Sequence, residues 1–276
     1  MLSCPICQTP LVLNCTQTPK TYQCASKHSY DVAKEGYVNL HVVQHKNSKR
    51  AGDTPESVQA RRRFLAQGFY EPLRTKIGEI LSDSALFFKP FSVLDIGCGE
   101  GYYTARLAEC AKMVFGLDIA KSAVQASAKA HKNTANITWV VGTGAVLPMM
   151  DGSIDVCTSF FSPLPKREMC RVLKANGYLL LATPAPNHLF SLRKRLFEQV
   201  VPHSPDKFLD ELAPEFRLVH SWQIDSELSL DGQSLSDLID MTPYTYKARL
   251  ENKTALKSLA EFKTSASFML YLLQKS

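Results

Sequence analysis

A short apolar strand followed by closely spaced glycines is the most informative stretch of this sequence: Val93-Leu94-Asp95-Ile96-Gly97-Cys98-Gly99-Glu100-Gly101-Tyr102-Tyr103-Thr104. The apolar residues predict a buried strand, and the residues after Gly101 predict the start of a helix. Glycines in such a turn let the backbone approach a ligand without obstruction by side chains. The stretch therefore predicts a strand–turn–helix unit that binds a nucleotide-like ligand at its turn.

The spacing of the glycines separates two classes of ligand. A dinucleotide turn has the pattern Gly-x-Gly-x-x-Gly, but the positions that would need its last glycine are Tyr102 and Thr104. The observed spacing fits S-adenosylmethionine (SAM), whose methionine moiety lies over such a turn. The next apolar run ends in Asp118, nineteen residues after Gly99, where a carboxylate can accept both ribose hydroxyls. We therefore expect a SAM site that includes Gly97, Gly99, Gly101 and Asp118, with Asp95 serving the cofactor and the turn.

Apolar runs and helical periods alternate around this turn. The expected strands are residues 91–96, 113–119, 137–142, 154–160 and 178–183. The expected helices between them lie near 102–110, 121–132 and 165–174, and two more, divided at Gly68 and Pro72, lie within 57–83. Later segments predict helices near 188–200 and 234–240, and strands at 217–230 and 267–274 that would form an antiparallel edge. The pattern predicts an α/β fold with a doubly wound parallel sheet, the Rossmann-like class I SAM-dependent methyltransferase fold.

Four of the 8 cysteines lie in the first 24 residues, with the spacing of a metal site. Cys4 and Cys7 form a C-x-x-C turn, and Cys24 and His28 follow after sixteen residues. Two such turns can enclose one tetrahedral zinc ion, and four protein ligands make that zinc structural rather than catalytic. Cys15 is an alternative fourth ligand, and four unrelated reduced thiols are the alternative to a metal site. We expect a small N-terminal zinc-binding domain, which the metal would stabilise in place of a large apolar core.

Composition and charge set the broader class. Apolar residues make up 45% and charged residues 21% of the 276 residues, as in an ordinary globular protein. The apolar runs are too short to cross a membrane and no secretory signal is visible, so we expect a soluble, cytoplasmic protein. Residues 1–63 carry a net charge of +5 out of the +6 of the whole chain, from 9 basic and 4 acidic side chains. A basic segment beside a nearly neutral body indicates a polyanionic partner, although a merely solubilising surface is an equal alternative.

These features together resemble the RlmA family, which methylates N1 of a guanine in a hairpin loop of 23S ribosomal RNA. The zinc motif and the glycine turn occur in the order of that family. Further segments extend the resemblance over essentially the whole chain: Ala33–Leu40, Val43–Lys46, Gln59–Arg62, Ala182–Pro184 with His188, and Met241–Pro243. The end of the fourth strand departs from the family pattern, because Phe160-Phe161-Ser162-Pro163 stands where Tyr-Ala-Pro is usual.

The resemblance implies a division of the chain and further site residues. Residues 1–40 would be a zinc-binding, RNA-recognising domain with ligands at Cys4, Cys7, Cys24 and His28, residues 41–57 a linker, and residues 58–276 the methyltransferase domain. Cofactor contacts would also come from Tyr70, Tyr103, Thr104 and His188. At the position where relatives bond adenine with an Asp, this chain has none, and Thr143 or backbone groups would take that role. A homodimer is a further implication of the resemblance.

The expected reaction needs an RNA-binding surface and a pocket for the target base. Basic side chains of the first quarter would hold phosphates: Lys34, Lys46, Lys49, Arg50, Arg61, Arg62 and Arg63. Phe160 or Phe161 could stack on the unstacked guanine, although a role in the core is expected to be about twice as common for such residues. The sequence does not identify the group that accepts the N1 proton. A small-molecule SAM-dependent methyltransferase and a non-catalytic zinc-containing RNA-binding protein are the alternatives.

Overall fold

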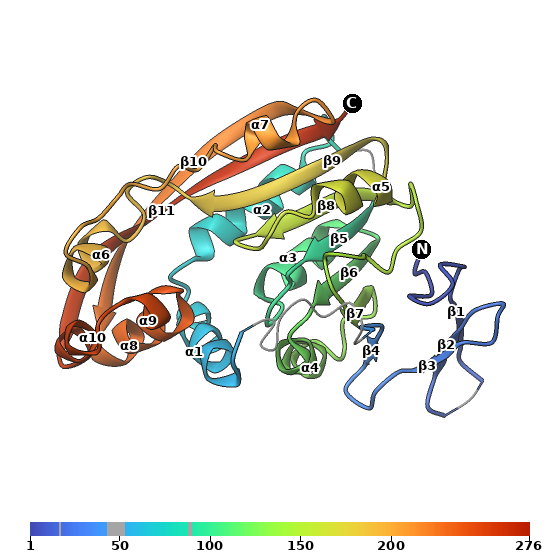
Figure 1. Cartoon of the computed structure of the whole chain (residues 1–276), viewed down its shortest axis with the longest axis horizontal. Helices are drawn as coiled ribbons and strands as arrows, with labels where there is room; N and C mark the ends of the chain where they lie inside the picture. The colour runs from blue at the N-terminus through green and yellow to red at the C-terminus, as the bar shows by residue number, and fades with distance from the viewer. Residues whose placement is uncertain (17, 43–52, 88–89) are drawn as a thin grey trace.

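The structure is a computed structural model that describes residues 1–16, 18–42, 53–87 and 90–276. Its helices and strands follow one another as shown in Figure 1. The strands are β1 (Val12–Asn14), β2 (Thr21–Gln23), β3 (Ser29–Asp31), β4 (Tyr37–Asn39), β5 (Ser92–Ile96), β6 (Met113–Asp118), β7 (Ile137–Val141), β8 (Ile154–Phe160), β9 (Leu173–Pro184), β10 (Phe216–Asp231) and β11 (Glu261–Lys275). The helices are α1 (Pro55–Ala66), α2 (Glu71–Ser82), α3 (Tyr102–Cys110), α4 (Lys121–Ala130), α5 (Lys166–Val172), α6 (Phe190–Leu196), α7 (Leu209–Leu212), α8 (Gly232–Met241), α9 (Tyr244–Lys247) and α10 (Leu250–Lys257).

Eight strands form the large sheet, in the order β10-β11-β9-β8-β5-β6-β7-β4. The strands from β4 to β9 pair in parallel, whereas β11 pairs antiparallel with both β9 and β10. The chain winds outward from β5 in one direction through β6 and β7, and in the other through β8 and β9. Ligands of such folds bind at the carboxyl ends of the strands beside this reversal. The reversal lies between β5 and β8, so the turn at residues 97–101 is in the expected position.

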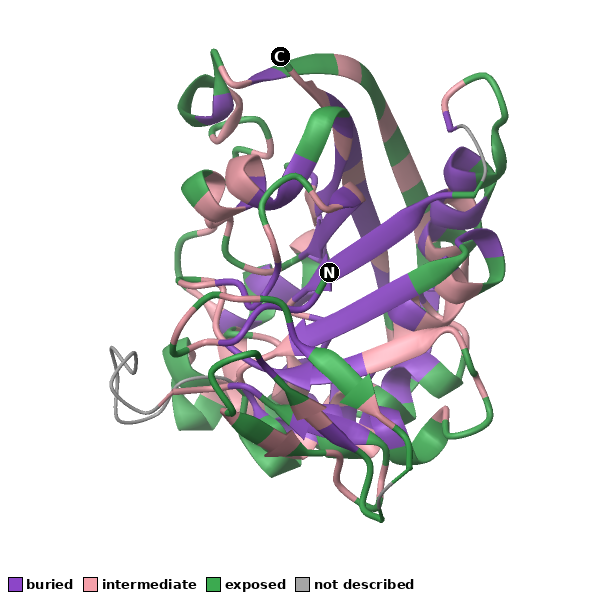
Figure 2. Cartoon of the chain, turned by 90° about the vertical axis from the view of Figure 1, so that its right-hand side faces the viewer, coloured by how far each residue is buried: buried purple, intermediate pink, exposed green. Residues whose placement is uncertain are grey.

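Each face of the large sheet has its own apolar core. On one face, α2 and α3 pack through Leu73, Ile77 and Leu107 on alternate strand residues such as Val93 and Leu180. On the other face, α5 and the N-terminal segment pack on residues that include Leu94, Phe115 and Leu179. The central strands are accordingly buried along most of their length (Figure 2). Burial on both faces explains why these strands are continuous apolar runs in the sequence.

The N-terminal segment forms a small separate sheet and also joins the large one. Strands β1, β2 and β3 pair antiparallel and are largely exposed or half-buried. Strand β4 instead pairs in parallel with β7 and becomes an edge of the large sheet. Tyr37 and Val38 of this strand are only 6% and 1% exposed, so their burial against the body holds β4 there. The expected boundary at residue 40 therefore follows a strand that belongs to the large sheet.

The predicted elements agree well with those of the structure. The two helices within 57–83, the parallel strands and the antiparallel edge are all present. Strand β9 begins at Leu173 rather than at residue 178, because its first residues pair with β8 through a bulge. Asn176 lies in this bulge with φ 60°, and the pairing register shifts between Ile154 and Val156 of β8. Among the described residues, no helix is both long and apolar enough to cross a membrane.

Candidate functional site

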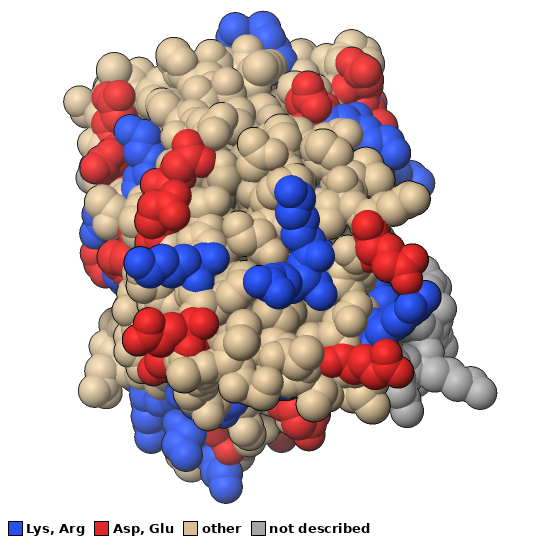
Figure 3. Space-filling view, turned by 90° about the vertical axis from the view of Figure 1, so that its left-hand side faces the viewer, with Lys and Arg blue, Asp and Glu red and all other residues tan. Residues whose placement is uncertain are grey.

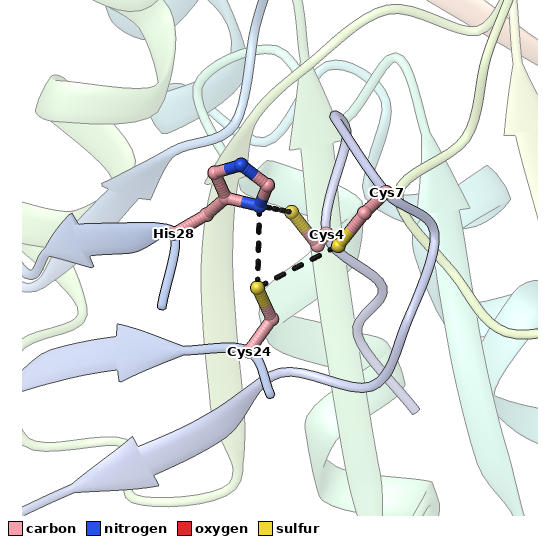
Figure 4. Close-up of side chains that lie close together, drawn as sticks. All are labelled: Cys4, Cys7, Cys24 and His28. Atoms are coloured by element: carbon pink, nitrogen blue, oxygen red, sulfur yellow. Dashed lines mark hydrogen bonds between the residues drawn. The ribbon is translucent and has the colours of Figure 1, made fainter. Parts of the chain in front are cut away.

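Four side chains of the N-terminal segment point toward one another (Figure 4): Cys4, Cys7, Cys24 and His28. Their sulfur and nitrogen atoms all lie within 4.8 Å of one another. The Cys7 Sγ–Cys24 Sγ distance is 3.6 Å, and His28 Nδ1 lies 3.5 Å from Cys4 Sγ and 3.3 Å from Cys24 Sγ. A tetrahedron with ordinary zinc bond lengths has edges of about 3.8 Å between two sulfurs and about 3.5 Å between sulfur and nitrogen. The set therefore fits zinc, whereas Cys15 is exposed and lies outside it.

Local backbone geometry forms the two turns that hold these side chains. In the first turn, Gln8 N–H donates to Cys4 O at 2.8 Å, and in the second, Lys27 N–H donates to Cys24 O at 2.9 Å. Gln8 and Lys27 have φ values of 57° and 66°, which end each turn in the left-handed region. Each turn thus reverses tightly enough to present its two metal-site side chains on one side.

The first three residues of the chain attach this cluster to the body. Ser3 N–H donates to Pro148 O at 3.0 Å, and Met150 N–H donates to Met1 O at 2.8 Å. Leu2, Cys4, Leu11 and Cys24 share one apolar core with β7 and with the loop that follows it. The metal cluster is consequently part of the same packed unit as the large sheet.

The glycine turn has the backbone conformation that the sequence predicts. Gly101 caps α3 with φ 85°, and a Cβ atom there would lie 2.7 Å from Trp139 Cη2. Gly99 has φ 54°, and the one contact that a Cβ atom there would make with the described residues is to the Arg61 guanidinium, at 3.3 Å. Side chains other than hydrogen are therefore strained or excluded at these positions. The turn brings the backbone to the end of β5 in the form of a cradle, which is consistent with a bound methionine moiety.

Asp118, at the end of β6, closes this cradle from the side. Its Oδ2 accepts a hydrogen bond from Gly99 N–H at 2.9 Å, and its Oδ1 accepts one from Ala120 N–H at 2.7 Å. Burial raises the pKa of Asp118, and the two backbone donors oppose that shift. Each carboxylate oxygen keeps a further lone pair, so the group can also accept two ribose hydroxyls.

The loop after β7 lies beside Asp118. Gly142 N–H donates to Asp118 O at 3.0 Å, and Thr143 Oγ1 accepts from Ala145 N–H at 3.2 Å. Thr143 thus stabilises its own turn. Its suggested role toward adenine stays a prediction.

Asp95 and Thr104, both predicted cofactor residues, bond to each other beneath the turn. Thr104 Oγ1 donates to Asp95 Oδ2 at 2.6 Å, and Thr158 Oγ1 donates to Asp95 Oδ1 at 2.8 Å. The two predicted residues are 2% and 0% exposed. Burial raises the pKa of Asp95 to about 6 against the two hydroxyl donors. The two hydrogen bonds to Asp95 join β5 to α3 and β8, and this fixes the position of the turn.

The other predicted cofactor residues, Tyr70, Tyr103 and His188, lie in one aromatic group. Phe268 of β11 links them, because its ring centroid lies 4.8 Å from both Tyr70 and His188 and 5.4 Å from Phe161. The Phe161 ring in turn lies 6.4 Å from that of Tyr103. Residues separated by more than a hundred positions in the sequence are therefore brought together at the carboxyl edge of the sheet.

Burial sets the protonation of this group. It raises the pKa of Tyr70 and of Tyr103, and it lowers the pKa of His188 to about 3. His188 Nδ1 lies 3.0 Å from Ser267 O, which fixes the ring. The Tyr103 hydroxyl has no hydrogen-bond partner in the part of the chain that the structure describes. The phenols and the imidazole are consequently neutral, and one buried hydroxyl is free to bond a ligand.

Phe160 and Phe161 differ in a way that the sequence did not indicate. Phe160 is 6% exposed and belongs to the core, as expected. Phe161 is 43% exposed with φ 61°, because the chain leaves strand geometry there and turns the ring outward. The expectation of a core role is confirmed for Phe160 and wrong for Phe161.

The interpretation of Arg61 and Arg63 as phosphate-binding residues is not supported by their surroundings. Arg61 forms an ion pair with Asp53 and lies 3.3 Å from Glu100 Oε2, above the glycine turn. Arg63 binds the buried carboxylate of Asp237 through Nε and Nη2, at 3.0 and 2.6 Å, and so ties α1 to α8. Ion pairs within the chain therefore use both guanidinium groups, although no sequence pattern linked them to these acids.

The remaining basic residues predicted to contact phosphates are either exposed or outside the described residues. Lys34 and Arg62 are exposed, whereas Lys46, Lys49 and Arg50 lie outside the described residues. On the face shown in Figure 3, basic and acidic side chains are interspersed. Ion pairs among the described residues include Lys257 with Asp240 at 2.6 Å and Arg249 with Glu198 at 2.8 Å. This face therefore offers no broad area of a single charge.

Comparisons with known proteins agree with these features. A family model described as "RlmA, N-terminal" matches residues 2–49, and one described as "Methyltransferase domain" matches residues 93–177. The 23S rRNA (guanine(748)-N(1))-methyltransferase of Streptomyces fradiae is 33% identical over 89% of this chain and 85% of its own length. A candidate 23S rRNA (guanine-N(1)-)-methyltransferase of Bacillus subtilis is 30% identical over 94% of this chain and 92% of its own length.

Solved structures show the same fold. A chain from the complex between the Haloferax volcanii Trm112 methyltransferase activator and its methyltransferase partner superposes with a TM-score of 0.53 and 16% identity, covering 82% of this chain and 99% of that chain. The glycine turn, the zinc-type cluster and the relatives that match most of the chain thus indicate the same family. The chain belongs to the RlmA family of SAM-dependent 23S rRNA (guanine-N1)-methyltransferases.

Proposed function

We propose that this enzyme transfers a methyl group from SAM to N1 of a guanine in a hairpin loop of 23S ribosomal RNA. The observation that carries the proposal is the attachment of the metal cluster to the cofactor-binding body. Residues 1–3 bond to residues 148–150, within the loop that connects β7 to β8 and starts beside Asp118. An RNA bound by the N-terminal segment would therefore be held in a fixed position relative to the sheet and its cofactor turn.

The proposed cofactor site uses the cradle at the end of β5. The methionine moiety would lie over Gly97, Gly99 and Gly101, and the ribose hydroxyls would bond to Asp118. Asp95 and Thr104 would support the turn, and Tyr70, Tyr103 and His188 would border the cofactor. When bound, SAM supplies a methyl group that its sulfonium already makes electrophilic. The residues of the chain then have to position the acceptor and exclude water.

The aromatic group supplies a surface for the target base. Phe161 is exposed beside Tyr103, and a guanine that leaves its loop can stack on such a ring. The free hydroxyl of Tyr103 is available to the cofactor or to the base. His188 is a weak base because burial lowers its pKa to about 3, so we do not assign the removal of the N1 proton to it.

In the proposal, the N-terminal segment is the RNA-recognising part. Cys4, Cys7, Cys24 and His28 would bind a structural zinc ion, since four protein ligands leave no position for a reacting water. The proposal keeps the division into residues 1–40, 41–57 and 58–276, except that α1 already begins at Pro55, and β4 is the strand that joins the first part to the sheet. Exposed Lys34 and Arg62 would contact phosphates. The proposal also includes a cytoplasmic location and a homodimer. Light scattering of the purified protein would test the homodimer.

Labelled methyl transfer to unmodified 23S ribosomal RNA tests the function. The proposal predicts 1-methylguanosine after digestion of the product to nucleosides. Transfer to small acceptors without transfer to RNA would favour a small-molecule methyltransferase. RNA binding without SAM binding would favour a non-catalytic protein.

A further inference from the structure

The guanidinium of Arg61 lies directly above the cofactor turn. Its Nη1 is 3.3 Å from the position of a Cβ atom on Gly99 and 3.3 Å from Glu100 Oε2. Arg61 reaches this place from α1, a helix that starts at Pro55 with the Thr54 hydroxyl accepting from Ser57 N–H. A cation is thus held where the proposed cofactor places its amino-acid end.

The two acids that hold Arg61 differ in their surroundings. The side chain of Glu100 is 7% exposed, whereas that of Asp53 is 44% exposed. Glu100 therefore forms the inner and permanent partner, because a buried carboxylate without a cation would be costly. Asp53 is the outer partner, and an ion pair that is open to water contributes little free energy. A second anion of suitable shape can replace Asp53 at small cost.

We propose that Arg61 binds the α-carboxylate of the methionine moiety of SAM, and that Asp53 occupies this position on Arg61 when the cofactor is absent. This inference rests on the proposed function. The planar guanidinium matches a carboxylate through two parallel hydrogen bonds. The glycine at position 99 leaves room for the carboxylate to approach. The interaction makes Arg61 a specificity residue for ligands that carry the amino-acid end of the cofactor.

Isothermal titration calorimetry with two nucleosides tests the assignment. S-adenosylhomocysteine carries the α-carboxylate, whereas 5′-methylthioadenosine has the same adenosine and sulfur without the amino acid. In Arg61→Gln, we expect affinity for S-adenosylhomocysteine to fall about tenfold to a hundredfold, which is the size of one charge-assisted interaction. Affinity for 5′-methylthioadenosine should change less than about threefold. Arg249→Gln, which removes an exposed guanidinium paired with Glu198, is the matched control and should bind both ligands as the unmodified protein does.

A second variant avoids the risk that Arg61→Gln disturbs the fold by leaving Glu100 unpaired. Asp53→Asn removes the competing carboxylate and leaves Arg61 and Glu100 in place. We expect it to bind S-adenosylhomocysteine about two- to fivefold more tightly, with affinity for 5′-methylthioadenosine unchanged. Equal losses for both nucleosides in Arg61→Gln, or weaker binding of S-adenosylhomocysteine by Asp53→Asn, would overturn the inference. If the unmodified protein binds neither nucleoside, the proposed cofactor site fails as well.

Discussion

Replacing Asp118 by asparagine tests how one carboxylate closes the turn and, in the proposal, holds the ribose. The two carboxylate oxygens accept from Gly99 N–H and Ala120 N–H, and an amide can accept from only one of these donors. The other donor then faces an NH₂ group. Loss of one hydrogen bond to a charged acceptor costs about 1.5–3 kcal/mol. Burial raises the pKa of Asp118 because it makes the charged carboxylate costly. The asparagine carries no charge, and the removal of this cost offsets part of the loss. We therefore expect the free energy of unfolding to fall by about 1–2 kcal/mol.

The same variant should bind cofactor more weakly. Two charge-assisted bonds to the ribose become at most one neutral bond, so affinity for S-adenosylhomocysteine should fall about tenfold to a hundredfold. Calorimetric titration measures the affinity, and urea unfolding measures the stability. Asp83→Asn is the matched control, because Asp83 accepts from the backbone of Ala85 in an exposed turn. It should leave the affinity unchanged.

A double-mutant cycle decides whether the ribose is the partner. The 2′-deoxy analogue of S-adenosylhomocysteine should lose affinity for the unmodified protein but lose much less for Asp118→Asn. Independent losses from the two changes would refute the assignment of Asp118 to the ribose, even if the variant binds cofactor weakly.

Three other expectations concern the metal, the turn and a buried acid. Cys24→Ser should abolish zinc binding and lower the melting temperature of the whole chain in one calorimetric transition, since Cys24 shares a core with the large sheet; a separate ribbon transition with the main one unchanged would contradict this. Gly101→Ala should lower the free energy of unfolding by about 2–4 kcal/mol, from left-handed strain and a contact of 2.7 Å with Trp139; a urea-unfolding loss below about 0.5 kcal/mol would show that the turn can relax. Asp95→Asn should remove one pH dependence of the free energy of unfolding. Because the pKa of Asp95 is raised from 3.8 to about 6 in the folded state, that group destabilises the fold as pH rises through this window. Between pH 5 and 7.5, the free energy of unfolding of the unmodified protein should fall by about 1.4 kcal/mol more than that of the variant. Urea unfolding at both pH values measures this difference, and equal losses in the two proteins would contradict the reasoning.

Much of the fold could be predicted because its signals are local. The strands are continuous apolar runs, the glycine turn has a fixed spacing, and the metal residues lie in two short turns. The sequence did not indicate that β4 joins the large sheet, because three residues are too few for any periodicity. Its position depends on the burial of Tyr37 and Val38 against the body.

The candidate site shows the same limit. Arg61 pairs with Glu100 across 39 positions, and only the packing of α1 beside the turn brings them together. Its place in a run of three arginines favoured RNA binding, which is the usual meaning of such a run. Phe268 belongs to an apolar strand near the end of the chain, and nothing in its sequence context separates it from core residues. Long-range packing, rather than local pattern, decides these roles.

Mapping of the methylated base tests the account most directly. The unmodified protein, with labelled SAM, would be incubated with a 23S ribosomal RNA transcript, and the digested oligonucleotides would be sequenced by mass spectrometry. The account predicts a single methyl group on N1 of a loop guanine in one hairpin. A methyl group on another atom or on paired RNA, or transfer that persists unchanged after the zinc is removed, would contradict it.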